Sequence, residues 1–131
     1  MSPSIRIGTV GEERFVVADE HVITFADAGM PAVLSTPTLV GRLEQTARKA
    51  IQPLLPPGHS SVGIMIELEH LAPTPPGREV VCRARVIYVD GPRITFQLEA
   101  ADEHEPIARG THKRHIVETT RLEKRVARKR P

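Results

Sequence analysis

The chain has 131 residues, of which 40% are apolar and 26% charged, a length and composition that fit one globular domain and exclude a disordered chain. Cys82 is the only cysteine, so no disulfide can form within one chain, and no segment resembles a secretory leader or approaches the roughly 18 apolar residues of a membrane helix. The formal net charge of +2 excludes a strongly basic protein overall, and we expect one cytoplasmic domain over residues 1–131 with no membrane partner.

Two short strands are predicted before the first long element. Residues 13–18 are rich in β-branched and aromatic side chains, and residues 22–25 form a second apolar run. Residues 26–30 contain Gly29 and precede Pro31, which is typical of a loop.

Residues 36–55 are the only long stretch with helical periodicity. At 100° per residue, one apolar stripe contains Val40, Leu43, Ala47, Ile51 and Leu54. Thr36 followed by Pro37 predicts the start of the helix, with the threonine hydroxyl as its cap, and Pro53 places its end near Gln52. We expect one amphipathic helix here.

After this helix the period of the apolar residues changes from 3.6 to 2. The inward positions predicted for three strands are Val62, Ile64, Ile66, Leu68 and His70, then Val80, Cys82, Ala84, Val86 and Tyr88, then Ile94, Phe96, Leu98 and Ala100. A last strand is predicted over residues 107–117. Three consecutive turn-linked strands of this kind form an antiparallel meander.

One helix with one apolar stripe must cover the apolar face of this meander. The predicted fold is therefore α+β, an antiparallel sheet wrapped around one long helix. Such a sheet has exposed edge strands, and pairing between edges would remove them, so we expect a homodimer.

Two polar residues occupy places where the pattern predicts core. His70 lies on the apolar face of its strand, and Glu44 flanks the apolar stripe of the helix. A carboxylate that hydrogen-bonds an imidazole raises its basicity, which suits general-base catalysis, although such a pair also occurs as a structural feature of cores. Thr36 would add a hydroxyl at the helix N-terminus, where free backbone N–H groups favour an oxyanion. Taken alone, Thr36 is equally explained as a cap.

Four segments together carry a family resemblance. They are Thr36-Pro-Thr-Leu-Val-Gly-Arg-Leu-Glu44, Gly63-Ile-Met-Ile-Glu-Leu-Glu-His70, Pro73-Thr-Pro-Pro-Gly77 and Gly110-Thr-His-Lys-Arg114. With their spacing they resemble the fluoroacetyl-CoA thioesterase family over roughly residues 15–124. The resemblance implies the hot-dog fold, a dimer, and hydrolysis of an acyl-CoA thioester to the free acid and CoA.

The resemblance also implies site residues. The family's catalytic threonine, glutamate and histidine fall on Thr36, Glu44 and His70. A glycine whose backbone N–H holds the thioester carbonyl matches Gly63, and an arginine near the site matches Arg114. From the residues alone, Gly63 would be explained as a strand bulge and Arg114 as a surface charge.

One segment departs from the family pattern. In the fluoroacetate-specific members, phenylalanines in a lid before the threonine exclude water and recognise fluorine. The corresponding positions here hold Asp27 and Met30. We therefore expect that the hydrolytic residues are kept and that selectivity for fluoroacetate is not.

The basic tail over about 119–131 contains Arg121, Lys124, Arg125, Arg128, Lys129 and Arg130. It could hold an anion such as a phosphate or be a solvated terminus. Nucleic acid is not an expected partner, because no aromatic residues are interleaved to stack bases. His112 and His115 are three apart on a strand and point to opposite faces, so we expect no metal site and no cofactor.

The leading function is thus an acyl-CoA thioesterase. A non-catalytic acyl-CoA binding protein of the same fold is the main alternative. A hydratase of this fold ranks lower, because such enzymes place a histidine near the start of the helix and residues 36–55 contain none. The sequence leaves open whether Thr36 is a covalent nucleophile or holds an attacking water.

Overall fold

The computed structural model describes residues 5–23 and 28–131. Its elements are β1 (Val10–Val16), the short 3-10 turn η1 (Asp19–His21), β2 (Val22–Ile23), β3 (Val33–Leu34), α1 (Thr36–Ile51), the turn η3 (Gln52–Leu54), β4 (His59–His70), β5 (Glu79–Asp90), β6 (Arg93–Ala101), β7 (Pro106–Glu118) and α2 (Thr119–Ala127). The first strand therefore begins three residues before the predicted one. The second ends at Ile23, and residues 24–27 lie outside the described part.

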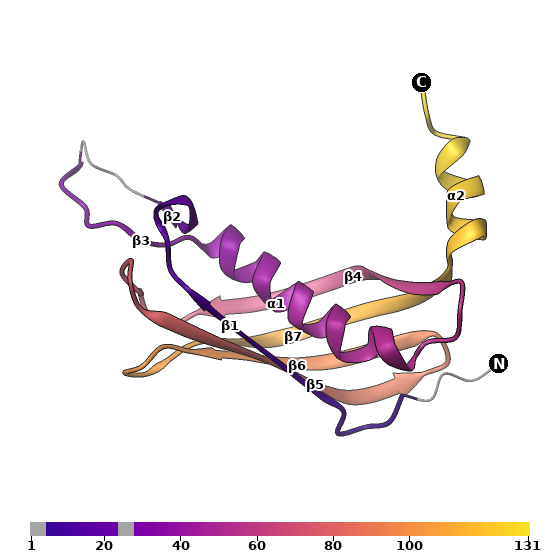
Figure 1. Cartoon of the computed structure of the whole chain (residues 1–131), viewed down its shortest axis with the longest axis horizontal. Coiled ribbons are helices and arrows are strands. Elements are labelled where there is room, and N and C mark those ends of the chain that lie inside the picture. The colour runs from indigo at the N-terminus through magenta and orange to yellow at the C-terminus, as the bar shows by residue number, and fades with distance from the viewer. Residues whose placement is uncertain (1–4, 24–27) are drawn as a thin grey trace.

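Five antiparallel strands form one sheet in the order β1-β5-β6-β7-β4, and β2 pairs with β3 apart from it. Helix α1 lies across one face of the sheet (Figure 1). The α+β architecture predicted from the sequence, a sheet wrapped around one long helix, is confirmed.

The core lies between α1 and the covered face of the sheet. The helix contributes Leu39, Leu43, Ala47 and Ile51, all fully buried, together with Thr46. Thr46 is tolerated because its hydroxyl donates to the carbonyl of Arg42 at 2.8 Å. The predicted stripe is thus centred on Leu39 rather than Val40, and Leu54, 39% exposed, lies past the helix end.

Strand β4 contains a bulge that changes which of its side chains face the helix. Gly63 pairs with Arg114 and Met65 with Lys113, so Ile64 is an extra residue without a partner in β7. Ile66 and Leu68 after the bulge pack on the core, as predicted, whereas Ile64 is 46% exposed. The prediction that Ile64 faces inward is wrong, and before the bulge it is Ser61 rather than Val62 that is buried.

A register shift in β5 has the same consequence at one position. The inward residues Val80, Cys82, Ala84 and Val86 are fully buried, as predicted. The pairing with β6 shifts between Val86 and Tyr88, and Tyr88 is 57% exposed. Strict alternation cannot survive an inserted residue, so the inward placement of Tyr88 is wrong.

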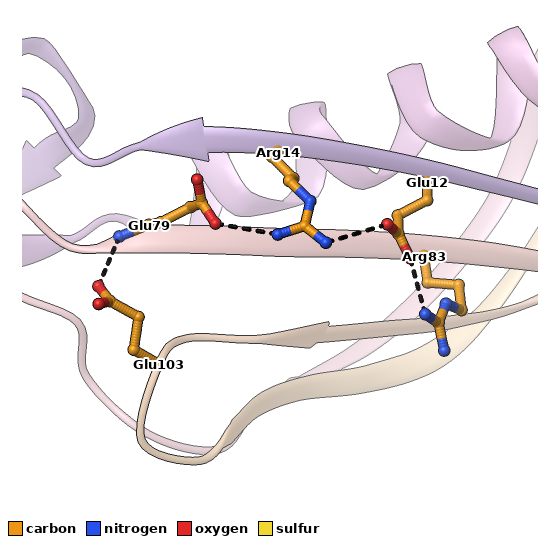
Figure 2. Close-up of polar contacts among 5 residues, drawn as sticks. All are labelled: Glu12, Arg14, Glu79, Arg83 and Glu103. Atoms are coloured by element: carbon orange, nitrogen blue, oxygen red, sulfur yellow. Dashed lines mark hydrogen bonds and ion pairs between the residues drawn. The ribbon is translucent and has the colours of Figure 1, made fainter.

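The two edges of the sheet differ in chemistry. Along the β1 edge, Glu12 accepts from Arg83 at 2.7 Å and Arg14 at 3.4 Å, and Arg14 also donates to Glu79 at 3.1 Å (Figure 2). The backbone N–H of Glu79 donates to Glu103 at 3.1 Å. Charges of this kind discourage an edge from pairing with another chain. The opposite edge, β4, has 12 residues and exposes Ile64.

The predicted basic tail forms helix α2. Its start is fixed to the loop before β4, because the backbone N–H and the hydroxyl of Thr119 both donate to the carbonyl of Gly58, at 2.9 and 3.1 Å. None of its residues is buried. In Figure 1 the helix stands away from the body, beyond β4.

Candidate active site

The start of α1 presents Thr36 without using it as a cap. The cap is Ser35, whose hydroxyl accepts from the backbone N–H of Thr38 at 3.3 Å and donates to its side chain at 2.8 Å. Pro37 occupies the second helical position. The expectation that Thr36 caps the helix is therefore wrong by one residue, and its hydroxyl is left available at an exposed position.

That hydroxyl meets the last residue of β4. Thr36 Oγ1 lies 2.8 Å from His70 Nδ1, a hydrogen-bond distance. The helix N-terminus and the strand end thus bring together two of the three predicted catalytic residues, 34 positions apart in the sequence.

The environment of His70 keeps its imidazole uncharged. Burial lowers the pKa of His70 below its ordinary 6.5, against a smaller opposing contribution from the backbone of Ala72. Its other ring nitrogen, Nε2, is buried and has no hydrogen-bond partner among the described residues. A neutral ring with Nδ1 facing a hydroxyl can accept the proton of that hydroxyl, which is the arrangement that general-base catalysis requires.

Glu44 belongs to a different group of side chains. Its Oε2 lies 3.7 Å from Arg114 Nη1 and 4.0 Å from His112 Nε2. Gly63 makes room for it, since a Cβ added to that glycine would lie 2.5 Å from the same oxygen. Gly63 therefore has a steric reason to be glycine. We call these four residues, with Ser61, the Glu44 cluster.

The buried part of the Glu44 cluster, Arg114 and His112, is held in place by hydrogen bonds. Arg114 donates from Nε to the Ser61 hydroxyl at 2.8 Å and from Nη2 to the Ser61 carbonyl at 2.9 Å. His112 is 1% exposed, and its Nδ1 lies 2.8 Å from the Met65 carbonyl, which requires a proton on Nδ1. Its Nε2 then accepts from Arg114 Nη1 at 3.2 Å.

Burial also shifts the pKa values of His112 and Arg114. It lowers the pKa of His112, and the charge of Arg114 acts in the same direction. Burial likewise lowers the pKa of Arg114, while Glu44 opposes this. The result is one fixed positive charge held under the carboxylate by a neutral histidine. Sequence reasoning named Arg114 but gave His112 no definite role, although its place opposite Ile66 in the ladder is set by the pattern of β7.

The predicted contact between Glu44 and His70 is not present within one chain. Eight residues separate Thr36 from Glu44 on the helix, about 12 Å along its axis at 1.5 Å per residue. His70 therefore meets the first turn of α1 and Glu44 meets the middle of β4. The site within one chain consists of two polar groups rather than one triad.

The segment predicted to replace the family lid is only partly described. Asp27 and Phe25 lie outside the described residues, and Met30 is 55% exposed. Among residues 5–23 and 28–131, no group of three or more histidine, cysteine or acidic side chains has the arrangement of a metal site. No helix in this part of the chain is long and apolar enough to cross a membrane.

Comparisons with known proteins point to one family. The family model described as fluoroacetyl-CoA-specific thioesterase, FlK, matches residues 7–120. The fluoroacetyl-CoA thioesterase of Streptantibioticus cattleyicolor is 31% identical to the chain over 139 residues, covering 100% of this chain and 99% of that protein.

Solved structures extend the similarity to the fold. A structure of the fluoroacetyl-CoA thioesterase FlK matches with a TM-score of 0.89 and 30% identity, covering 98% of this chain and 99% of that one. A hot-dog-like protein from Thermanaerovibrio acidaminovorans matches with a TM-score of 0.87 and 30% identity, covering 95% and 93%. The hot-dog fold expected from the sequence is confirmed.

Proposed function

The chain belongs to the fluoroacetyl-CoA-specific thioesterase family and is a thioester hydrolase, and we propose that it cleaves a small acyl-CoA to the free acid and CoA. The observation that carries this proposal is the 2.8 Å contact between Thr36 Oγ1 and His70 Nδ1 at the N-terminus of α1. A non-catalytic acyl-CoA binding protein would have no use for a neutral base placed against a free hydroxyl.

In the proposed reaction His70 Nδ1 takes a proton as the oxygen attacks the thioester carbonyl. The attacking oxygen is either Thr36 Oγ1 itself or a water that Thr36 holds. The C–S bond then breaks, and the proton on His70 goes to the departing CoA thiolate. In the covalent route, water attacks the acyl-threonine in a second step with His70 again as the base; the bond between the acyl carbon and Oγ1 then breaks, the proton returns to Thr36 Oγ1 and the free acid leaves. The partial positive charge at the N-terminus of α1 favours the negative charge that develops on the carbonyl oxygen, although the N–H of Thr38 is taken by Ser35 and Pro37 has none.

We further propose that Glu44, Gly63 and Arg114 act in the same site across a homodimer interface. Along one strand, seven residues separate Gly63 from His70, about 23 Å at 3.3 Å per residue. If β4 pairs antiparallel with the β4 of a second chain about a two-fold near its centre, Gly63 of the partner subunit lies opposite Ile66. That position is only about 13 Å from His70. The charged β1 edge and the exposed Ile64 support β4 as the pairing edge.

The acyl group is proposed to be small but not restricted to fluoroacetate. The support is the sequence of the lid segment, where Asp27 and Met30 stand in place of the family's phenylalanines. A carboxylate near the acyl group would attract water rather than exclude it.

The test is release of free thiol from a panel of acyl-CoA esters that includes acetyl-, fluoroacetyl-, propionyl- and butyryl-CoA. We expect turnover of short esters, with a kcat/KM for fluoroacetyl-CoA no more than about tenfold above that for acetyl-CoA. Calorimetric binding of the same esters without thiol release by any of them would contradict the proposed activity. Trapping and mass spectrometry of an acyl-enzyme would distinguish covalent Thr36 from direct attack by water.

A cytoplasmic location is also proposed, because the one thiol of the chain is built into its core. Cys82 is fully buried, and burial raises the pKa of its thiol to about 12, so it behaves as a small apolar side chain. Fractionation of the source cells would test the location.

A further inference from the structure

Helix α2 carries a concentration of positive charge that the proposed reaction does not use. Residues 119–131 contain six basic side chains and one acid, Glu123. Glu123 is already paired with Arg130 at 2.7 Å. In the part of the chain that the structure describes, the remaining basic residues of this segment form no ion pair.

Four of these residues line a groove. The groove lies between α2 and the end of β7, has a volume of about 810 Å³, and includes Arg121, Lys124, Arg125 and Arg128 in its walls. Glu118 also lines the groove, so four cations and one carboxylate face the same concave surface. The excess of positive charge attracts a ligand with several negative charges, and phosphate groups are the common ligand of such clusters.

Within one chain the groove is too far from Thr36 and His70 to act on the same substrate. Thr119 is hydrogen-bonded to Gly58, just before β4, whereas His70 ends that strand. Eleven steps of about 3.3 Å separate the two ends of β4 by roughly 36 Å. The pantetheine arm of CoA has about thirteen bonds between its sulfur and its first phosphorus. It therefore reaches roughly 15 Å when extended, by the 3.3–3.6 Å that three chain bonds span.

Across the proposed dimer, the groove of one subunit lies close to the Thr36–His70 contact of the other. In an antiparallel pair of β4 strands about a central two-fold, the start of one strand lies beside the end of the other. His59 of the partner subunit then lies opposite His70. The partner's α2 therefore begins within a strand spacing or two of the Thr36–His70 contact. Figure 1 is consistent with this, because α2 rises past β4, the strand at that edge of the sheet.

We propose that the basic groove of each α2 binds the phosphate groups of the CoA whose thioester is held by Thr36 and His70 of the other subunit. The first two turns of a helix cover about 11 Å, so Arg121, Lys124 and Arg125 stand at the distance where an extended pantetheine arm delivers its diphosphate. This inference rests on the proposed thioesterase function and assigns its substrate a second binding site, in trans.

The test compares two double variants of equal charge. Arg121→Gln with Arg125→Gln removes half of the groove's cations and keeps good helix formers. Arg6→Gln with Arg85→Gln removes two exposed cations at the distant β1–β5 side as a control. At low salt we expect the groove variant to raise KM for the acyl-CoA about tenfold with little change in kcat, and the control to match the parent.

A substrate without phosphates separates binding from a structural effect. The same acyl group on N-acetylcysteamine should be hydrolysed equally by the parent and both variants. If the groove variant loses activity equally on both substrates, or keeps the parental KM for acyl-CoA, the inference is overturned.

Hybrid dimers test the assignment to the partner. One subunit would carry His70→Ala and the other the two groove substitutions, with different affinity tags to isolate the hybrid. The only intact catalytic histidine then faces the intact α2 of the other subunit, so we expect about half of the parental kcat with the parental KM. A raised KM in the hybrid would place the phosphates on the same subunit and refute binding in trans.

Calorimetry with CoA itself keeps this inference distinct from the proposed reaction. If the parent releases no thiol but binds CoA more tightly than the groove variant does, the reaction fails and the phosphate site stands. If thiol is released but both proteins bind CoA alike, the phosphate site is wrong. Loss of oligonucleotide binding by the groove variant, with CoA binding unchanged, would also overturn it.

Discussion

Two histidines on neighbouring strands, His70 and His112, are both buried at least in part but differ in the hydrogen bonds that their ring nitrogens make. In both, burial lowers the pKa and Nδ1 is hydrogen-bonded. His112 uses both ring nitrogens, on the Met65 carbonyl and on Arg114. His70 has one nitrogen against a threonine hydroxyl and the other buried without a partner among the described residues.

The difference separates a residue that can react from one that supports. Neither nitrogen of His112 faces a group whose proton it could take, because Nδ1 donates to a carbonyl and Nε2 accepts from a guanidinium, so the ring fixes its neighbours in place. Nδ1 of His70 faces the Thr36 hydroxyl and can take its proton. We therefore interpret His70 as the base and His112 as a positioning residue for Arg114 and Glu44.

Replacing His70 should have the largest effect. His70→Ala is expected to lower kcat about 10²–10⁴-fold on the best substrate of the panel, the range that positioned acid–base groups contribute. The melting temperature should change little, because the ring leaves no protein partner unpaired except an exposed hydroxyl. Parental turnover in this variant would remove His70 from the mechanism.

Thr36 gives the next largest effect. Thr36→Ala is expected to lower kcat by about 10²-fold, comparable to losing one hydrogen-bonding group in the transition state. Thr36→Ser is the matched control, because it keeps the oxygen and should recover most of the rate. Since Ser35 and not Thr36 caps α1, neither change should destabilise the helix, which thermal unfolding would check. Equal rates in both variants would show that the hydroxyl does not participate.

His112 should instead matter to stability. His112→Ala is expected to lower the free energy of unfolding by about 2 kcal/mol, because it leaves the Met65 carbonyl and one N–H of Arg114 buried and unpaired. His112→Asn, which keeps a donor, should lose less. Urea unfolding measures both. A His112→Ala variant as stable as the parent but inactive would reverse the two roles.

Lowering the pH should reduce the stability of the fold by protonating both His70 and His112. It should reduce catalysis by protonating His70 alone. A pKa that is lower in the folded state means that unfolding takes up protons, so the free energy of unfolding falls as the pH drops from about 6.5 toward the lower pKa of each folded histidine. The slope is at most about 1.4 kcal/mol per pH unit for each histidine. His112→Asn should flatten this slope. The acid limb of kcat/KM, by contrast, should lie below pH 6.5 and stay in place in that variant.

The smallest expected effect tests whether the Glu44 cluster acts together with Thr36 and His70. Gly63→Ala would place a methyl group 2.5 Å from Glu44 Oε2, at the flexible end of a half-exposed side chain. The carboxylate should move off Arg114, and the methyl group would also lie 3.2 Å from Cε1 of the buried His112, so we expect a small loss of stability as well. The value of kcat should fall about three- to tenfold if Glu44 takes part in the reaction. An unchanged kcat would confine chemistry to Thr36 and His70.

Periodicity predicted the sheet and helix because burial imposes it on every residue of a regular element. It failed where one residue interrupts the regularity. Strict alternation placed both Ile64 and Tyr88 inward. Ile64 is itself the unpaired residue of the β4 bulge, and Tyr88 directly follows the register shift in β5. A bulge depends on the pairing of two strands distant in sequence, which counting along one strand does not contain.

The site residues were found for two different reasons. His70 stood out as a polar group on an apolar face, while Thr36, Gly63 and Arg114 were named through the family resemblance. The contact of Glu44 with His70 is not made within one chain. Both lie near the core side, but helix rise separates them by more than a side chain can span. The cap was misassigned because Thr36 stands directly before Pro37, which was taken as the first helical residue, whereas proline occupies the second position and the adjacent Ser35 is the cap.

The bulge in β4 also makes the strand unequal in its tolerance of insertions and deletions. Deleting Ile64 would leave every other side chain of β4 on its present face, because Ile64 is the residue without a partner. It would also remove the irregularity beside which the Met65 carbonyl meets His112. Deleting one residue between Ile66 and His70 would do the reverse, turning the histidine outward with the bulge intact. The deletion that the strand tolerates best is therefore that of Ile64. Its loss would affect the contact of His112, the positioning residue, and would leave His70, the proposed base, in place.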